Sequence, residues 1–158
     1  MVSIGDQLEL NFTVKSAHGD ETRTGSFREL VTRPTIVSVY MRNNTSSCDR
    51  QIQQMKEIAP QLDAMGVALI GVSKDTVGSH SKYACKLELE FPLVSDPDHR
   101  FAKATDSLVE KKMYGKTFWG PVRAAYLIDP SGAVLGLIEK VDSAAHADQL
   151  LALAKKAG

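Results

Sequence analysis

Apolar and polar positions along the N-terminal half of the chain follow the period of β-strands. Alternation predicts a strand over Gln7–Val14, a turn over Ser16–Asp20 and a returning strand over Glu21–Ser26. Runs rich in β-branched and other apolar residues predict buried strands over Thr35–Tyr40 and Val67–Val72. The pattern therefore indicates an N-terminal hairpin followed by two buried strands.

A 3.6-residue apolar repeat predicts a long helix between the two buried strands, from about Ser47 to Met65, with Pro60 inside it and Gly66 after it. A second helix is predicted over Ser79–Leu87, with Ser79 as its cap. The remaining predicted elements are the extended segment Phe91–Ser95, the short helix His99–Thr105, the strands Ala124–Ile128 and Val134–Lys140 around the turn Asp129–Gly132, and the helix Ala144–Lys155. This order predicts an α/β fold of thioredoxin-like type, with an N-terminal β-hairpin extension and a mixed central sheet flanked by helices.

The length and charge of the chain limit its class. Its 158 residues suit one domain spanning residues 1–158. Lys plus Arg and Asp plus Glu each number 19, so the net charge is zero, which argues against nucleic acid or an anionic membrane as a partner. No apolar run approaches the roughly 20 residues of a membrane span, and the N-terminus lacks the features of a signal peptide. We therefore expect a cytoplasmic protein, in which two cysteines indicate transient redox chemistry or inert thiols.

Cys48 stands at the predicted start of the long helix, in a polar loop that follows the strand Thr35–Tyr40. A thiol at a helix N-terminus faces the positive end of the helix dipole and unpaired backbone N–H groups, which favour the reactive thiolate. An inert cysteine is normally packed among apolar residues, so the polar surroundings of Cys48 favour a reactive thiol. Thr45, three residues earlier, has two open roles: helix N-cap, or a hydroxyl that hydrogen-bonds a substrate oxygen beside the sulfur.

Two further residues each have a structural and a functional interpretation. Arg123 precedes the strand Ala124–Ile128, and it is either a solvated arginine or a guanidinium that reaches the Cys48 thiolate and the substrate oxygens. Cys85, in the second predicted helix, is either a semi-buried cysteine without a role or a resolving thiol. Because the two cysteines lie on different helices, a bond between them would require local unfolding of one or both helices.

The histidines show no metal-site spacing with each other or with the cysteines, and we expect all four to be caps and surface residues: His18, His80, His99 and His146. The sequence contains no glycine-rich phosphate loop, no Gly-x-Ser-x-Gly and no His-Glu-x-x-His. We therefore expect neither a metal nor a cofactor.

Several short landmarks occur together over nearly the whole chain: Gly5-Asp6, Thr45-x-x-Cys48, Gly71 to Asp75, Ser79-His80, Phe91 to Asp96, Glu110 to Lys116, Arg123 before Tyr126 to Asp129, and His146-Ala147. Taken together, these landmarks resemble the peroxiredoxin Q (bacterioferritin comigratory protein) branch of the peroxiredoxins. The resemblance implies a thioredoxin-like fold and a thiol peroxidase that reduces hydroperoxides without metal, haem or flavin.

The resemblance also implies a role for each candidate residue. Cys48 matches the peroxidatic cysteine, which attacks the peroxide O–O bond and becomes sulfenic acid. Thr45 matches a threonine that hydrogen-bonds the peroxide, and Arg123 matches an arginine that stabilises the thiolate and the transition state. Cys85 stands near the place where some members carry a resolving cysteine, so either Cys85 or an external thiol resolves the sulfenic acid. Thioredoxin or a similar thiol is then the expected reductant, and a monomer is the expected assembly.

Three positions depart from the family pattern. Met41 replaces the proline that shields the sulfur, Ser46-Ser47 replaces Pro-Gly, and Gln53 replaces the resolving cysteine that many members carry five residues after the first. These departures leave a second hypothesis open, a redox-responsive binding or chaperone-like protein with a slow, degraded peroxidase site. A disulfide exchange protein is disfavoured, because Thr45-x-x-Cys48 lacks the second thiol of a Cys-x-x-Cys motif.

Overall fold

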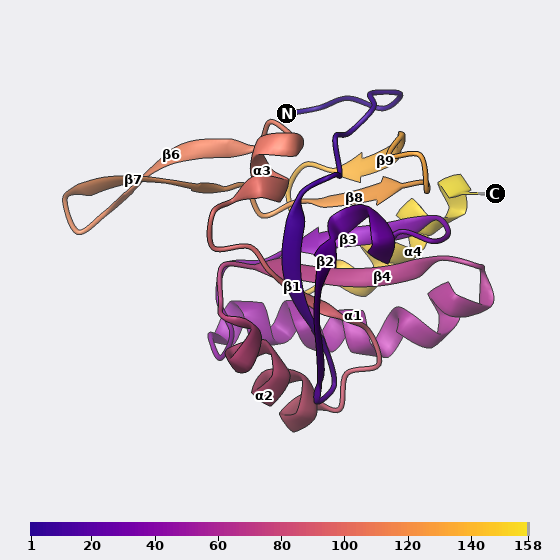
Figure 1. Cartoon of the computed structure of the whole chain (residues 1–158), viewed down its shortest axis with the longest axis horizontal. Coiled ribbons are helices and arrows are strands. Elements are labelled where there is room, and N and C mark those ends of the chain that lie inside the picture. Colours follow the sequence, from indigo (N-terminus) through magenta and orange to yellow (C-terminus); the bar gives the residue numbers. More distant parts are fainter. Residues whose placement is uncertain (158) are drawn as a thin grey trace.

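Seven strands form one mixed sheet in the computed structural model, which describes residues 1–157 (Figure 1). The strand order is β2-β1-β5-β4-β3-β8-β9. The central pairs β3–β4 and β4–β5 are parallel, and the outer pairs are antiparallel. The strands are β1 (Thr13–His18), β2 (Glu21–Ser26), β3 (Thr35–Val39), β4 (Ala68–Ser73), β5 (Leu93–Ser95), β8 (Ala125–Ile128) and β9 (Val134–Ile138).

Both faces of this sheet are covered, because neighbouring residues of the central strands point into different apolar clusters. Ile36 and Leu127 face one cluster, whereas Val37 and Tyr126 face the other. The first cluster packs against helices α1 (Ser46–Ala64), α2 (Val77–Leu87) and α4 (His146–Ala154). The second packs against the 3₁₀ turn η1 (Phe27–Leu30) and helix α3 (Arg100–Ala104), and a further 3₁₀ turn, η2 (Lys155–Ala157), follows α4. The predicted mixed sheet with helices on both faces is thus what the chain forms.

Helix α1 follows the predicted helix to within one residue at each end. Thr45 is the N-cap residue with extended backbone, and an apolar stripe of Ile52, Met55 and Leu62 faces the sheet. The helix runs through Pro60 and ends at Ala64, with Met65 as the C-cap residue. Gly66 follows with a φ of +79°, which glycine adopts without strain because it has no Cβ. This helix fixes Cys48 at the carboxyl end of β3.

Several predicted boundaries are wrong. The first strand is Thr13–His18 rather than Gln7–Val14, and the turn is reduced to Gly19 and Asp20. Gln7 instead makes an isolated bridge to Ala133, so the N-terminal segment pairs with the β8–β9 end of the sheet while Leu8 and Leu10 still enter the core. The cap of α2 is also corrected, because the Thr76 side chain accepts the N–H of Ser79.

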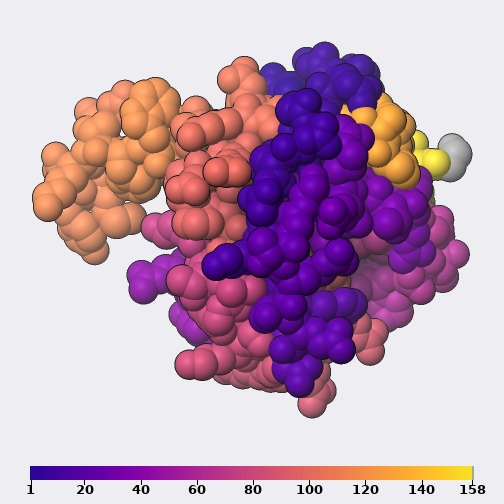
Figure 2. Space-filling view, in the orientation of Figure 1, coloured from indigo at the N-terminus to yellow at the C-terminus, as the bar shows by residue number. Residues whose placement is uncertain are grey.

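A second, two-stranded sheet was not predicted. Strands β6 (Leu108–Met113) and β7 (Lys116–Pro121) form a hairpin around Tyr114 and Gly115, both of which have positive φ. The hairpin projects from the rest of the molecule (Figures 1 and 2). Since most side chains of both strands are exposed, their sequence lacks the alternation by which a half-buried strand is recognised.

Candidate active site

Cys48 lies in the first turn of α1, and its side chain is only 1% exposed. The loop of residues 40–45 carries the chain from the end of β3 to the N-cap residue Thr45. The positive end of the α1 dipole therefore lies at the sulfur, which favours the thiolate. Both cysteines are free thiols.

Arg123 approaches this sulfur from the segment between β7 and β8. Its Nη2 lies 3.1 Å from Cys48 Sγ. Its backbone carbonyl accepts the N–H of Val141 at 3.0 Å, which anchors this segment to the chain after β9. Of the two sequence-based interpretations, the structure favours the second, because the guanidinium lies against the sulfur rather than in solvent. In this position its charge can stabilise a thiolate and a substrate oxygen together.

Two residues that orient Arg123 were missed from the sequence. Gln51 Oε1 accepts Arg123 Nε at 2.7 Å, and Ser47 Oγ accepts Nη1 at 3.3 Å. Gln51 is three residues after Cys48, so both side chains lie on the same face of α1. This spacing was the available signal for Gln51, but a glutamine on a helix is normally exposed, and here it is fully buried.

Thr45 is the N-cap residue of α1, but its side chain does not cap the helix. Its hydroxyl donates to the Arg42 carbonyl at 3.0 Å, and no side-chain hydrogen bond caps α1. The N-cap position considered for Thr45 is thus confirmed, whereas the hydrogen bond expected from an N–H near Cys48 to its hydroxyl is absent. Its proton is directed at Arg42, which leaves the oxygen lone pairs and the first-turn N–H groups for a ligand.

Cys85 is not brought to Cys48. It is exposed on α2, whereas the side of α2 that packs against the core carries Tyr83 and Ala84. The Tyr83 hydroxyl donates a short hydrogen bond to Asp49 Oδ1, next to Cys48 in the chain. Burial and this bond to Asp49 raise the pKa of Tyr83, so the phenol keeps its proton. The bond ties the first turn of α1 to α2 while Cys85 faces away.

Two of the four histidines are wholly buried, which corrects the expectation that all are caps and surface residues. His80 Nε2 lies 3.1 Å from the Val94 carbonyl, and His146 Nε2 lies 2.8 Å from Ser38 Oγ. Burial lowers the pKa of both rings. Sequence pattern missed them because both lie at or near the first turn of a helix, where exposed polar residues are common.

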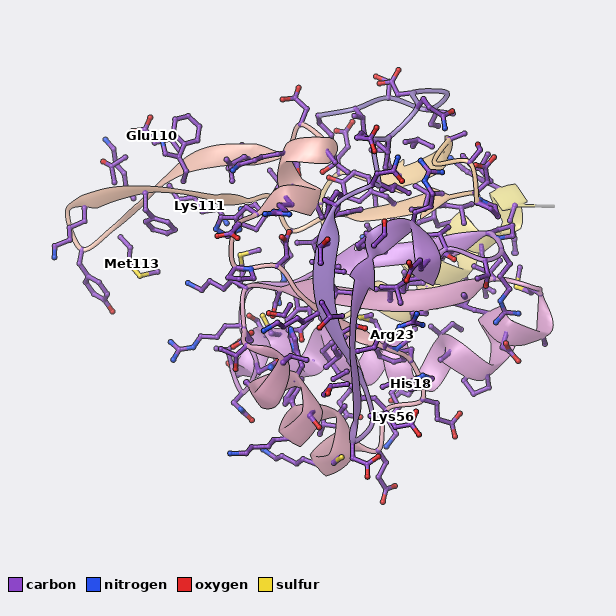
Figure 3. All side chains as sticks on the ribbon, viewed as in Figure 1. His18, Arg23, Lys56, Glu110, Lys111 and Met113 are labelled. Carbon is purple, nitrogen blue, oxygen red and sulfur yellow. The ribbon has the colours of Figure 1, made fainter. Side chains whose placement is uncertain are left out.

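A second cation, Lys111 of β6, stands near Arg123. Lys111 Nζ lies 3.2 Å from Met41 Sδ, so the residue in the place of the family proline contacts the hairpin. Burial lowers the pKa of Lys111, and the positive charges of Arg123 and Lys74 lower it further. Figure 3 shows Met113 on the side of the hairpin opposite to Glu110, as the strand alternation requires.

The sequence and the fold match known proteins. Residues 4–136 match the model of the AhpC/TSA family. The chain belongs to the AhpC/TSA family. Peroxiredoxin Bcp of Xanthomonas campestris pv. campestris is 37% identical over 120 residues, which cover 76% of this chain and 75% of that relative. The chain is therefore a peroxiredoxin, an enzyme of the thiol peroxidase class.

Solved peroxiredoxin structures have the same fold. The Xanthomonas campestris bacterioferritin comigratory protein, solved as trapped intermediate and ligand complexes in a study of its alkyl peroxide reduction, is 30% identical with a TM-score of 0.83. The alignment covers 94% of this chain and 95% of that one. A cysteine-to-serine variant of Xylella fastidiosa PrxQ is 28% identical with a TM-score of 0.84, covering 98% and 96%. The predicted thioredoxin-like α/β fold is confirmed for this peroxiredoxin.

Two further findings concern the residues that the structure describes. Within residues 1–157, no three histidine, cysteine, aspartate or glutamate side chains gather where they could hold a metal ion. Over the same residues, no helix has the length and apolar character needed to cross a membrane.

Proposed function

We propose that Cys48 is the peroxidatic residue of this peroxiredoxin and reduces hydrogen peroxide and organic hydroperoxides. The main support is the Arg123 guanidinium, which lies 3.1 Å from the sulfur and is held by Gln51 and Ser47. A cation fixed in a buried site favours the thiolate before reaction and stabilises negative charge on the departing oxygen during it. This preorganisation also favours a peroxidase over the redox-responsive binding protein with a degraded site.

The chemical step is a displacement at oxygen. The Cys48 thiolate attacks the terminal oxygen of ROOH, the S–O bond forms and the O–O bond breaks. Sulfur is oxidised to sulfenic acid, and the leaving alkoxide or hydroxide takes a proton to become alcohol or water. Arg123 touches the sulfur and is the cation closest to the departing charge.

Thr45 orients the substrate in this step. Because its proton is donated to the Arg42 carbonyl, its oxygen accepts the O–H of the hydroperoxide. The uncapped first-turn N–H groups of α1 supply donors for the other peroxide oxygen. The substrate is thus held between an acceptor and several donors, which aligns the O–O bond with the sulfur.

The sulfenic acid is then resolved by Cys85 or by an external thiol. Condensation with a thiol releases water and leaves a disulfide, which thioredoxin or a similar dithiol reduces by exchange. Cys48 is buried and Cys85 faces solvent, so an internal bond requires unwinding of the first turn of α1 and movement of α2. Breaking the Tyr83–Asp49 bond is part of that movement.

Peroxide-dependent oxidation of thioredoxin tests the peroxidase function. We expect activity in the wild type and none in Cys48→Ser, because serine is a poor nucleophile toward peroxide. The matched control is Cys85→Ser, which should keep the first oxidation of Cys48 whichever thiol resolves it. Full activity in Cys48→Ser would refute the proposal, and a wild-type rate constant near that of a free thiol would support the slow redox-responsive alternative.

Intact mass after one equivalent of peroxide separates the two routes of resolution. Loss of two hydrogens supports an internal Cys48–Cys85 disulfide. Gain of one oxygen on Cys48, or a disulfide-linked dimer, supports an external thiol. The Cys85→Ser variant cannot form an internal disulfide, so it should give the oxygen adduct or a dimer linked through Cys48.

A further inference from the structure

His146 is a buried residue that the peroxidase step proposed above does not use. It is the first residue of α4, is 0% exposed, and lies on a helix that packs along α1. The next residue, Ala147, donates its backbone N–H to Gln54 Oε1 at 3.0 Å, which ties the start of α4 to α1. Both ring nitrogens of His146 have hydrogen-bond partners, and these partners indicate its role.

The hydrogen bonds of His146 form one continuous chain to the active site. Arg123 Nε donates to Gln51 Oε1 at 2.7 Å, and Gln51 Nε2 donates to Ser38 Oγ at 2.9 Å. Ser38 Oγ in turn donates to His146 Nε2 at 2.8 Å, and His146 Nδ1 donates to Gln149 Oε1 at 2.9 Å. The three residues between the two ends are completely buried. Helix α4 is thereby connected to the guanidinium that touches Cys48.

The direction of this chain is fixed at both ends. Arginine has only donors, so Gln51 must present its oxygen to Arg123 and its NH₂ group to Ser38. At the other end, Gln149 Oε1 also accepts the N–H of Asp142 at 3.1 Å, and its Nε2 donates to the Lys140 carbonyl at 3.2 Å. His146 Nδ1 therefore carries the proton, and Nε2 offers its lone pair to Ser38.

The ring of His146 is neutral in this arrangement. Burial lowers its pKa and so does the positive charge of Arg123, whereas the bond to Gln149 and the charge of Asp142 act in the opposite direction. The Ser38 hydroxyl donates to Nε2 in this series of hydrogen bonds. Protonation of Nε2 would remove that acceptor, and the N–H of the ring would then face the O–H of Ser38.

We propose that His146 is a positioning residue for Cys48, acting through Ser38 and Gln51 to hold Arg123 against the sulfur. This inference rests on the proposed function of Cys48. Without an acceptor, the Ser38 hydroxyl donates to the Gln51 oxygen instead. The amide then turns, its NH₂ group meets the Arg123 Nε–H, and the guanidinium is pushed from the sulfur.

The size of this effect is limited by one further bond. Gln51 Nε2 also donates to the Val39 carbonyl at 3.2 Å, so the amide keeps one interaction that favours its present orientation. Loss of the His146 acceptor should therefore shift Cys48 reactivity by about fivefold, the value of roughly one buried hydrogen bond.

Alkylation of Cys48 across pH, without peroxide, tests the proposal in a Cys85→Ser background where only Cys48 reacts. His146→Leu should raise the midpoint pH of iodoacetamide alkylation by about 0.7, which corresponds to a fivefold change. His146→Gln keeps an oxygen acceptor for Ser38 and should stay within about twofold of the parent. Ser38→Ala removes the hydroxyl that would turn the amide, so it should stay within about twofold of the parent. Adding His146→Leu to Ser38→Ala should then cause no shift, because His146 acts only through that hydroxyl.

Leu153→Ala is the matched control on the same helix. Leu153 is buried in the first core cluster and takes no part in the hydrogen bonds between Arg123 and Gln149. This variant should therefore lose stability but keep the alkylation midpoint of its parent. An unchanged midpoint in His146→Leu, or additive shifts in the double variant, would overturn the positioning role. Because no peroxide is used, this outcome is distinct from failure of the peroxidase function.

A measurement on the wild type keeps the proposal testable if a variant fails to fold. The ¹⁵N–¹H spectrum of the histidine rings should show His146 protonated on Nδ1. His80 provides the contrast, since its Nε2 lies 3.1 Å from the Val94 carbonyl and should carry the proton. A proton on Nε2 of His146 at neutral pH would reverse the chain and refute the inference.

Discussion

Replacement of Arg123 by methionine tests the central electrostatic claim about the site. The side chain keeps a similar length but loses the charge and all three bonds, to Cys48, Gln51 and Ser47. A hydrogen bond to a charged group contributes roughly 1.5–3 kcal/mol, so the second-order rate constant with peroxide should fall by about 10- to 150-fold. Two unit charges 3.1 Å apart attract by about 5 kcal/mol at an effective dielectric constant of about 20, and partial exposure of Arg123 reduces this.

Arg123→Lys should give an intermediate loss, because a single ammonium cannot bind the sulfur, Gln51 and Ser47 at once. The assay is stopped mixing with peroxide followed by intact mass, which measures oxidation of Cys48 without any reductant. Arg100→Met, at an exposed arginine of α3, controls for the loss of one positive charge. An Arg123→Met rate constant within twofold of the wild type would refute the role of the guanidinium.

Three further outcomes are expected. Thr45→Val should lower the peroxide rate constant by about fivefold, with little effect on alkylation by iodoacetamide, because the proposed role of the Thr45 hydroxyl is to bind peroxide rather than sulfur. Thr45→Ser should restore the rate. The free energy of unfolding in urea should fall as pH drops below about 6.5, since His80 and His146 stay neutral when buried while unfolded histidine gains a proton, at no more than about 1.4 kcal/mol per pH unit for each ring. A flat profile between pH 5 and 7 would contradict this assignment. Tyr83→Phe should speed exchange of the Asp49 amide, whose N–H donates to the Thr45 carbonyl, by about tenfold, because the bond from Tyr83 to the Asp49 side chain is lost. Unchanged exchange would show that this bond does not hold the turn.

Local pattern was enough for the elements that build the core. The apolar stripe of α1 and the buried runs of β3 and β4 were recognised because each is long, periodic and buried against neighbours. Pattern failed where buried residues lie outside a strand and where paired strands are exposed. Leu8 and Leu10 alternate and are buried, yet they lie outside any strand, and the β6–β7 hairpin is paired throughout but largely exposed.

Sequence pattern alone pointed to the residues that we propose carry the chemistry. A cysteine at the start of a helix after a buried strand, a threonine three residues before it and an arginine before a later strand were all identified without coordinates. How these residues are held together depends on the packing of the folded chain. Arg123 meets Cys48 because β8 pairs with β3, and Gln51, Ser38 and His146 join them because α4 packs along α1. Such contacts join residues far apart in the chain, and the hydrogen-bond partner of a buried polar group is set by what surrounds it in space, not by what precedes it in sequence.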